Sequence, residues 1–169
     1  MGFEGTFSAA TAGLSVDRTF YTLDGKTADL DKVRQNDRLV VSIEGYNEDR
    51  GYHQVALLDL LPAGFEIESV VNKETVKNFS FLPNLTRTRM AEARDDRFFA
   101  AFDLGRRPYY SWWETDREEL DGGYRFHVAY IVRAVTPGRF ALPAVHVSDM
   151  YAPRVFGRTA MDHVTIAPR

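Results

Sequence analysis

The amino-acid sequence predicts an all-β fold, an antiparallel Greek-key β-sandwich, and three observations support this prediction. Short stretches in which β-branched and aromatic residues alternate with polar ones follow one another along most of the chain. Turn-forming sequences such as Asp24-Gly25 and Thr136-Pro137-Gly138 separate these stretches. No stretch of about 12 residues has the period of an amphipathic helix. Many short strands with turns between them are typical of a sandwich.

The expected strands begin at Leu14 and continue almost to the end of the chain. In order, they are 14–22, 38–46, 52–61, 65–71, 97–104, 124–134, 139–147 and 163–166. Apolar and polar residues alternate in 38–46, so this strand is predicted to be half-buried. Pro143 cannot donate a backbone hydrogen bond, so 139–147 is predicted to be an edge strand or to contain a bulge.

The stretch 124–134 is expected to supply the centre of the core. Its alternate residues fall on one face of the strand: Tyr124, Phe126, Val128, Tyr130 and Val132. We expect that face to pack with Leu39, Val41 and Ile43, or with Val55 and Leu57.

Two long segments have no clear hydrophobic period. The first, 72–89, is predicted to be an excursion containing a helical turn at most. The second, 105–123, is predicted to be a loop that carries the aromatic cluster Tyr109, Tyr110, Trp112 and Trp113. If exposed, this cluster is a binding platform for a sugar or a peptide, and the chain would be a carbohydrate-binding or adhesive extracellular module. If buried, it covers one open end of the sandwich.

The chain of 169 residues is long enough for one domain with a proper core. Residues 1–13 are mostly small and polar and are predicted to be a linker, while residues 14–169 form a single domain. A net charge of −3 does not favour a nucleic-acid partner. No stretch of about 20 apolar residues is present, so no membrane insertion is expected.

Motifs for catalysis and for cofactor binding are missing from the sequence. There is no cysteine, no hydrolase nucleophile elbow and no glycine-rich phosphate loop. The four histidines, His53, His127, His146 and His163, lack metal-ligand spacing. The pair Asp95-Asp96 lies between Arg94 and Arg97, which favours an ion-pair turn over a general acid. We therefore expect no enzyme activity, no cofactor and no metal.

Several blocks of sequence, in order, resemble the last, C-terminal macroglobulin-like domain of bacterial alpha-2-macroglobulins. The C-terminal blocks are 130–140 (YIVRAVTPGRF), Pro143, 149–153 (DMYAP) and Gly157, and the earlier ones are 33–41 (VRQNDRLVV), 59–68 (DLLPAGFEIE) and 94–97 (RDDR). The match runs from about Leu14 to Ile166, and it is the combination of blocks that is specific.

The resemblance implies a non-catalytic part of a large bait-and-trap protease inhibitor. In that family a protease cleaves a bait region, and the body then rearranges and entraps it. A thioester formed by a Cys-x-Glu-Gln motif lies in a separate helical domain, although some members lack it. The implied partners are the thioester domain of the same chain and, through the full-length protein, the target proteases. Family members are exported to the periplasm, often as lipoproteins, and no export signal is visible in this stretch.

The resemblance also assigns a role to Met150 and Tyr151. In the family a Met-Tyr dipeptide of the final domain helps to cover the thioester from water, so these two residues are the predicted interface. A thioether and an aromatic ring are large and adaptable apolar groups that can exclude water from a small site. From the residues alone, the alternative is that both side chains pack beneath the final strands.

Overall fold

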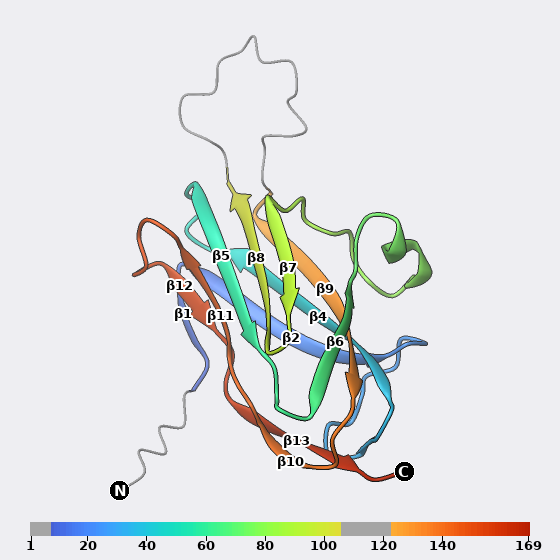
Figure 1. Cartoon of the computed structure of the whole chain (residues 1–169). Coiled ribbons are helices and arrows are strands. Elements are labelled where there is room, and N and C mark those ends of the chain that lie inside the picture. Colours follow the sequence, from blue (N-terminus) through green and yellow to red (C-terminus); the bar gives the residue numbers. More distant parts are fainter. Residues whose placement is uncertain (1–7, 106–122) are drawn as a thin grey trace, which may run out of the picture.

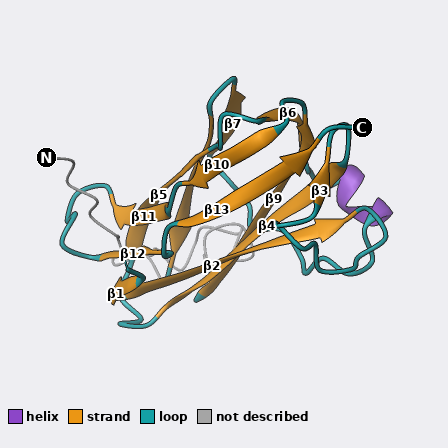
Figure 2. Ribbon diagram, turned by 90° about the horizontal axis from the view of Figure 1, so that it is seen from below, coloured by secondary structure: helices purple, strands orange, loops and turns teal. Residues whose placement is uncertain are grey.

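Two β-sheets face each other across one apolar core in the computed structural model, which describes residues 8–105 and 123–169 (Figure 1). One sheet has six strands in the order β1-β12-β11-β5-β8-β7, and the other has four in the order β2-β4-β9-β6. A three-stranded sheet, β10-β13-β3, lies across one end of the sandwich (Figure 2). Between the described strands all pairings are antiparallel except the short one of β13 with β3, and one isolated parallel bridge joins Gly13 to Phe156. The predicted antiparallel sandwich is confirmed.

The described elements are strands apart from one short 3-10 helix. In order, they are β1 (Ala10–Ala12), β2 (Leu14–Thr22), β3 (Val33–Arg34), β4 (Arg38–Asn47), β5 (His53–Leu60), β6 (Phe65–Val70), η1 (Thr75–Asn78), β7 (Met90–Arg94), β8 (Arg97–Leu104), β9 (Arg125–Ala134), β10 (Gly138–Leu142), β11 (Val145–Asp149), β12 (Phe156–Arg158) and β13 (Asp162–Ala167). Within these described ranges, no helix has the length and apolar character needed to cross a bilayer.

Strand β9 supplies the centre of the core, as predicted. Four of its inward residues are buried, namely Phe126, Val128, Tyr130 and Val132. Their cross-strand neighbours on β4 are Leu39, Val41 and Ile43, and Val55 and Leu57 of the facing sheet belong to the same cluster. Aromatic pairs join the two sheets, with ring centroids 4.7 Å apart for Phe98 and Tyr130. The prediction for Tyr124 is wrong, because this residue precedes β9 and is 38% exposed.

The outer face of the four-stranded sheet is also buried, contrary to the prediction of a half-buried strand at 38–46. Val40 is fully buried in a second cluster with Ala129 and Ile131. Val71 and Phe79, from the chain around η1, cover them. The segment 72–89 therefore packs on the outer face of the four-stranded sheet. The alternation of apolar and polar residues within one strand cannot predict that a distant segment will bury this face.

Two further details differ from the sequence prediction. Strand β7 was not predicted, because its residues are mostly exposed and include no β-branched side chain. Pro143 lies between β10 and β11, where the chain leaves the three-stranded sheet and enters the six-stranded one. It therefore separates two strands instead of marking an edge or a bulge within one.

The structure describes only part of the predicted linker and of the predicted loop at 105–123. Residues 10–12, at the end of the stretch predicted to be a linker, form β1 and pair with β12. The aromatic cluster from Tyr109 to Trp113 lies outside the described residues.

Asp95-Asp96 forms the turn between β7 and β8, and the Arg97 guanidinium lies 2.9 Å from the Asp96 carboxylate. The predicted ion-pair turn is confirmed for this pair.

Candidate docking site

Met150 and Tyr151 lie in the turn between β11 and β12, and both are exposed. Met150 is 42% exposed and Tyr151 is 82% exposed, the largest value among the exposed large hydrophobic residues of the described chain. The alternative in which both side chains pack beneath the final strands does not apply. We refer to residues 149–155 as the docking turn.

Backbone hydrogen bonds close the docking turn and tie it to the six-stranded sheet. The amide of Asp149 donates to the carbonyl of Val155 at 3.0 Å, and the amide of Val155 donates to the carbonyl of Ala152 at 2.9 Å. The amide of Met150 donates to the carbonyl of Gln54 on β5 at 2.8 Å. The exposed side chains therefore stand on a backbone that is itself hydrogen-bonded.

The carboxylate of Asp149 caps the turn from inside. Its Oδ1 accepts hydrogen bonds from the amides of Tyr151 at 2.8 Å and Ala152 at 3.0 Å. A short acidic side chain that accepts from amides two and three residues ahead stabilises a tight turn. Asp149 is 7% exposed, so the group that shapes the turn is itself buried.

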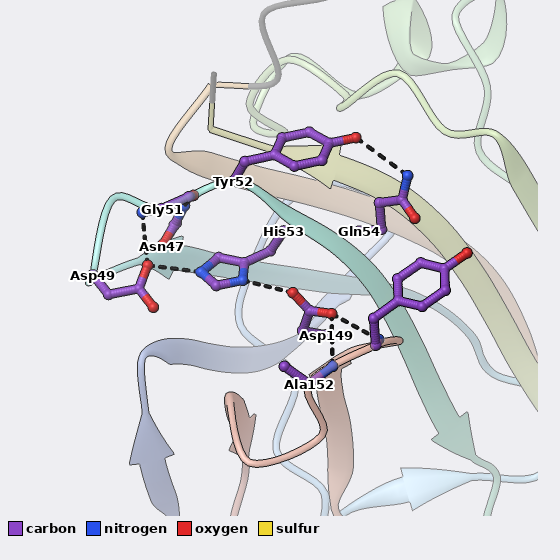
Figure 3. A network of polar contacts seen from close by, with 9 residues as sticks. Asn47, Asp49, Gly51, Tyr52, His53, Gln54, Asp149 and Ala152 are labelled. Atoms are coloured by element: carbon purple, nitrogen blue, oxygen red, sulfur yellow. Dashed lines mark hydrogen bonds and ion pairs between the residues drawn. The ribbon is translucent and has the colours of Figure 1, made fainter. Parts of the chain in front are cut away.

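A histidine links this carboxylate to a second one (Figure 3). His53 Nδ1 lies 2.8 Å from Asp149 Oδ2, and His53 Nε2 lies 2.7 Å from Asp49 Oδ1. His53 is the first residue of β5, and Asp49 lies in the turn between β4 and β5, where its Oδ1 also accepts from the amide of Gly51 at 2.7 Å. The three side chains form a row, with the imidazole between two carboxylates.

The row favours a protonated imidazole. Burial is the largest single influence on the pKa of His53 and lowers it, but hydrogen bonds to Asp49 and Asp149 and their charges together raise that pKa above the ordinary value. Burial likewise raises the pKa of each carboxyl, but hydrogen bonds from His53 and from backbone amides hold the pKa values of Asp49 and Asp149 below their ordinary range. The arrangement therefore favours an imidazolium between two carboxylates over a neutral imidazole.

The sequence identified the exposed pair but not its support. Asp149, one residue before Met150, is a local signal for a capped turn, and it could have been recognised. The link to His53 spans 96 residues and has no local signal. The other histidines lie apart: His127 is buried against Ser42 at 2.8 Å, His146 stacks on Phe156, and His163 is exposed. In the part of the chain that the structure describes, there is no group of three or more His, Cys, Asp or Glu side chains placed to hold a metal ion.

Comparison with known proteins places the chain in a family. The model of the bacterial alpha-2-macroglobulin MG10 domain matches residues 13–111 and 122–154. The chain belongs to this family. It is 32% identical over 164 residues to an alpha-2-macroglobulin of Xylella fastidiosa, which is 90% of this chain and 9% of that protein. It is 28% identical over 151 residues to the alpha-2-macroglobulin of Escherichia coli, which is 83% of this chain and 8% of that protein.

Solved structures agree with this assignment. The native conformation of E. coli alpha-2-macroglobulin superposes with a TM-score of 0.76 at 26% identity, over 98% of this chain and 10% of that one. Trypsin-activated E. coli alpha-2-macroglobulin gives a TM-score of 0.71 at 25% identity, over 96% of this chain and 11% of that one. The resemblance to macroglobulin-like domains of bacterial alpha-2-macroglobulins is confirmed. The chain spans about a tenth of the length of the relatives that it matches.

Proposed function

We propose that this domain is a non-catalytic docking module of a bacterial alpha-2-macroglobulin, a bait-and-trap protease inhibitor, and that Met150 and Tyr151 help to shield the thioester of the neighbouring domain. In this proposal it is the C-terminal domain of its parent, which acts in the periplasm, as a lipoprotein in some family members. The observation that carries the proposal is the 82% exposure of Tyr151 on a turn that is capped by the buried carboxylate of Asp149.

The exposed pair supports docking on physical grounds. Two adjacent large side chains, a thioether and a phenol, cost free energy in water and gain it when a partner covers them. Aromatic residues on a fixed backbone lose little conformational entropy on binding, which makes them good interface anchors. A thioester survives only while water is kept from its carbonyl carbon, and an aromatic ring seated over it would do so.

The relatives supply the context for this role. E. coli alpha-2-macroglobulin has been studied after activation by trypsin and by porcine elastase, and the Salmonella protein after reaction with methylamine. Proteases and a small amine nucleophile are the reagents expected to act on a bait region and on a thioester. We extend this to the parent of our chain, with the other domains of that parent as direct partners and proteases as targets of the whole protein. The family assignment favours this function over carbohydrate binding.

The test is methylamine inactivation of a full-length parent that carries the Cys-x-Glu-Gln thioester. Replacing Tyr151 with glycine should speed the loss of the thioester, because the ring no longer excludes the amine. Leu23→Gly is a matched control, since Leu23 is also an exposed large hydrophobic residue and follows β2, away from the docking turn. Equal rates for Tyr151→Gly and the wild type would reject the proposed function.

A further inference from the structure

We propose that His53 and Asp149 are positioning residues that fix the direction in which the docking turn presents Tyr151. This inference rests on the proposed function and adds the means by which the turn is held ready. It assigns a task to a row of charged groups in which His53 and Asp149 are buried and Asp49 is exposed.

Both oxygens of Asp149 are in use, and they point to different parts of the molecule. Oδ1 accepts from the amides of Tyr151 and Ala152, within the docking turn. Oδ2 lies 2.8 Å from His53 Nδ1, on β5. The carboxylate therefore connects the backbone at Tyr151 to a strand in the middle of the six-stranded sheet.

The row also reaches toward the opposite sheet. Asp49 follows β4, a strand of the four-stranded sheet, and holds the far side of the imidazole at 2.7 Å. The turn after β4 is itself fixed, because Asn47 Nδ2 donates to the carbonyl of Gly51 at 2.6 Å. The imidazole of His53 therefore connects Asp149, which caps the docking turn, to Asp49 in the turn after β4 (Figure 3).

Stability alone does not account for this arrangement. The amides of an exposed turn could be hydrogen-bonded by water, so the core does not need Asp149 to satisfy them. Buried charge pairs contribute little net stability compared with apolar side chains of similar size, and their best-attested use is to specify one conformation. The side chains of His53 and Asp149 are only 9% and 10% exposed, yet Asp149 accepts a hydrogen bond from the amide of the exposed Tyr151.

The proposed positioning of the docking turn also depends on the charge of the His53 imidazole. A neutral imidazole has one N–H donor, whereas the protonated form donates from both nitrogens. Two carboxylates face the two nitrogens here, Asp149 from β11 and Asp49 from the turn after β4. The cross-strand neighbour of His53 on β8 is the apolar Leu104, and among the described residues these carboxylates are the charged groups that shift the pKa of the ring. The complete row therefore exists only with an imidazolium.

The experiment uses the full-length parent and compares four variants with the wild type. Asp149→Ala removes both functions of the carboxylate. Asp149→Asn keeps an oxygen that can accept from the turn amides but removes the charge facing His53. His53→Leu removes the anchor but leaves the cap. His127→Leu is the control, because His127 is another buried, hydrogen-bonded histidine, on β9 against Ser42.

Two quantities are measured on each variant. The first is the rate of methylamine inactivation, for which we expect a rise of about tenfold in Asp149→Ala, a smaller rise in Asp149→Asn and in His53→Leu, and none in the control. The second is hydrogen exchange at the amides of Tyr151 and Ala152, measured on peptides that cover 148–156. It should accelerate in Asp149→Ala and stay close to wild type in Asp149→Asn.

A pH series separates positioning from a loss of packing. The inactivation rate of His53→Leu divided by that of the wild type cancels the protonation of methylamine itself. This ratio should fall toward one as the pH rises through the pKa of His53, because the wild type then loses its own imidazolium. A ratio that stays constant across that range would show that the charge of His53 has no part in positioning.

The outcomes distinguish this inference from the proposed function. If Tyr151→Gly speeds inactivation and Asp149→Ala does not, the docking function stands and the positioning role is wrong. If Tyr151→Gly has no effect, the docking function itself is wrong. Unchanged hydrogen exchange at Tyr151 and Ala152 in Asp149→Ala would overturn the positioning role whatever the inactivation rates.

Discussion

At the scale of single residues, His53 couples stability to pH. Its pKa in the folded chain is raised above the ordinary 6.5, because the bonds and charges of Asp49 and Asp149 outweigh the effect of burial. A raised pKa of a base contributes stability that is fully present below the unfolded value and is lost as the pH rises through the folded value. We expect the free energy of unfolding to decrease from about pH 6.5 upward through the raised pKa. Urea denaturation at a series of pH values measures this, and His53→Gln should lack that part of the slope.

His127 acts in the opposite direction. Burial lowers the pKa of His127 to about 4, against weaker opposition from the carbonyls of Pro83 and Asn84. The folded chain therefore favours the neutral ring, and it loses stability as the pH falls from the ordinary 6.5 toward 4. We expect the acid limb of the unfolding profile to flatten in His127→Leu. An acid limb identical to that of the wild type would show that the ring takes up its proton without cost.

Val128 tests the packing of the core at a single position. It is 4% exposed on β9, opposite Ile43, in the main apolar cluster. Val128→Ala removes two methyl groups from a close-packed site and should lower the free energy of unfolding by about 1–3 kcal/mol. Chemical denaturation measures this change. A loss below about 0.5 kcal/mol is typical of a surface position and would contradict the register of β9.

At the scale of elements, a buried polar cluster joins the two sheets. Arg18 on β2 lies 2.5 Å from Asp59 on β5, and its second nitrogen donates to the carbonyl of Pro143 at 2.8 Å. The hydroxyl of Tyr130 on β9 donates to the other oxygen of Asp59 at 2.5 Å. Burial raises the pKa of Tyr130 well above its ordinary value, so the phenol remains a donor. The cluster fixes the position of β5 relative to β2 and β9, which belong to the facing sheet.

Removing one member of this cluster should be costly. Arg18→Met leaves the fully buried carboxylate of Asp59 without its cation, and such losses cost about 3–5 kcal/mol. Arg139→Met, at an exposed position on β10, is the matched control and should change stability by less than about 0.5 kcal/mol. Thermal and urea unfolding of the two variants give the comparison. Similar stabilities for both would mean that Asp59 is protonated and needs no cation.

Features with a strong local sequence pattern could be predicted, whereas features that depend on contacts between residues far apart in the sequence could not. The alternation in β9 was sufficient to predict the inward face from Phe126 to Val132. The burial of Val40 depends on Phe79, which lies 39 residues further on and covers the sheet from outside. The docking turn shows the same division. The family resemblance, and not the residues alone, indicated that Met150 and Tyr151 are exposed, whereas the bond between Asp149 and His53 arises only when β11 pairs with β5.

At the scale of the whole molecule, Met150 and Tyr151 of the docking turn are exposed while the main apolar cluster between the two sheets is buried. The docking turn lies at the end of the sandwich opposite β10 and β13 (Figure 1). Glycine at position 157 lets β12 approach β2 behind this turn, because a Cβ there would lie 2.2 Å from the carbonyl oxygen of Leu14. The turn is therefore fixed to the body of the domain by close backbone packing as well as by the charged row.

The isolated chain should neither hydrolyse peptides nor inhibit proteases. In the proposed function the bait region and the enclosing body belong to other parts of a parent about ten times longer, so this domain alone has nothing with which to entrap a protease. Trypsin incubated with an excess of the 169-residue chain should keep its full activity toward a small chromogenic substrate and toward a large protein substrate. A trap blocks access of large substrates only, so the two substrates distinguish trapping from blockage of the active site. Stoichiometric loss of activity toward either would show that this domain inhibits by itself and would contradict its role as a docking part.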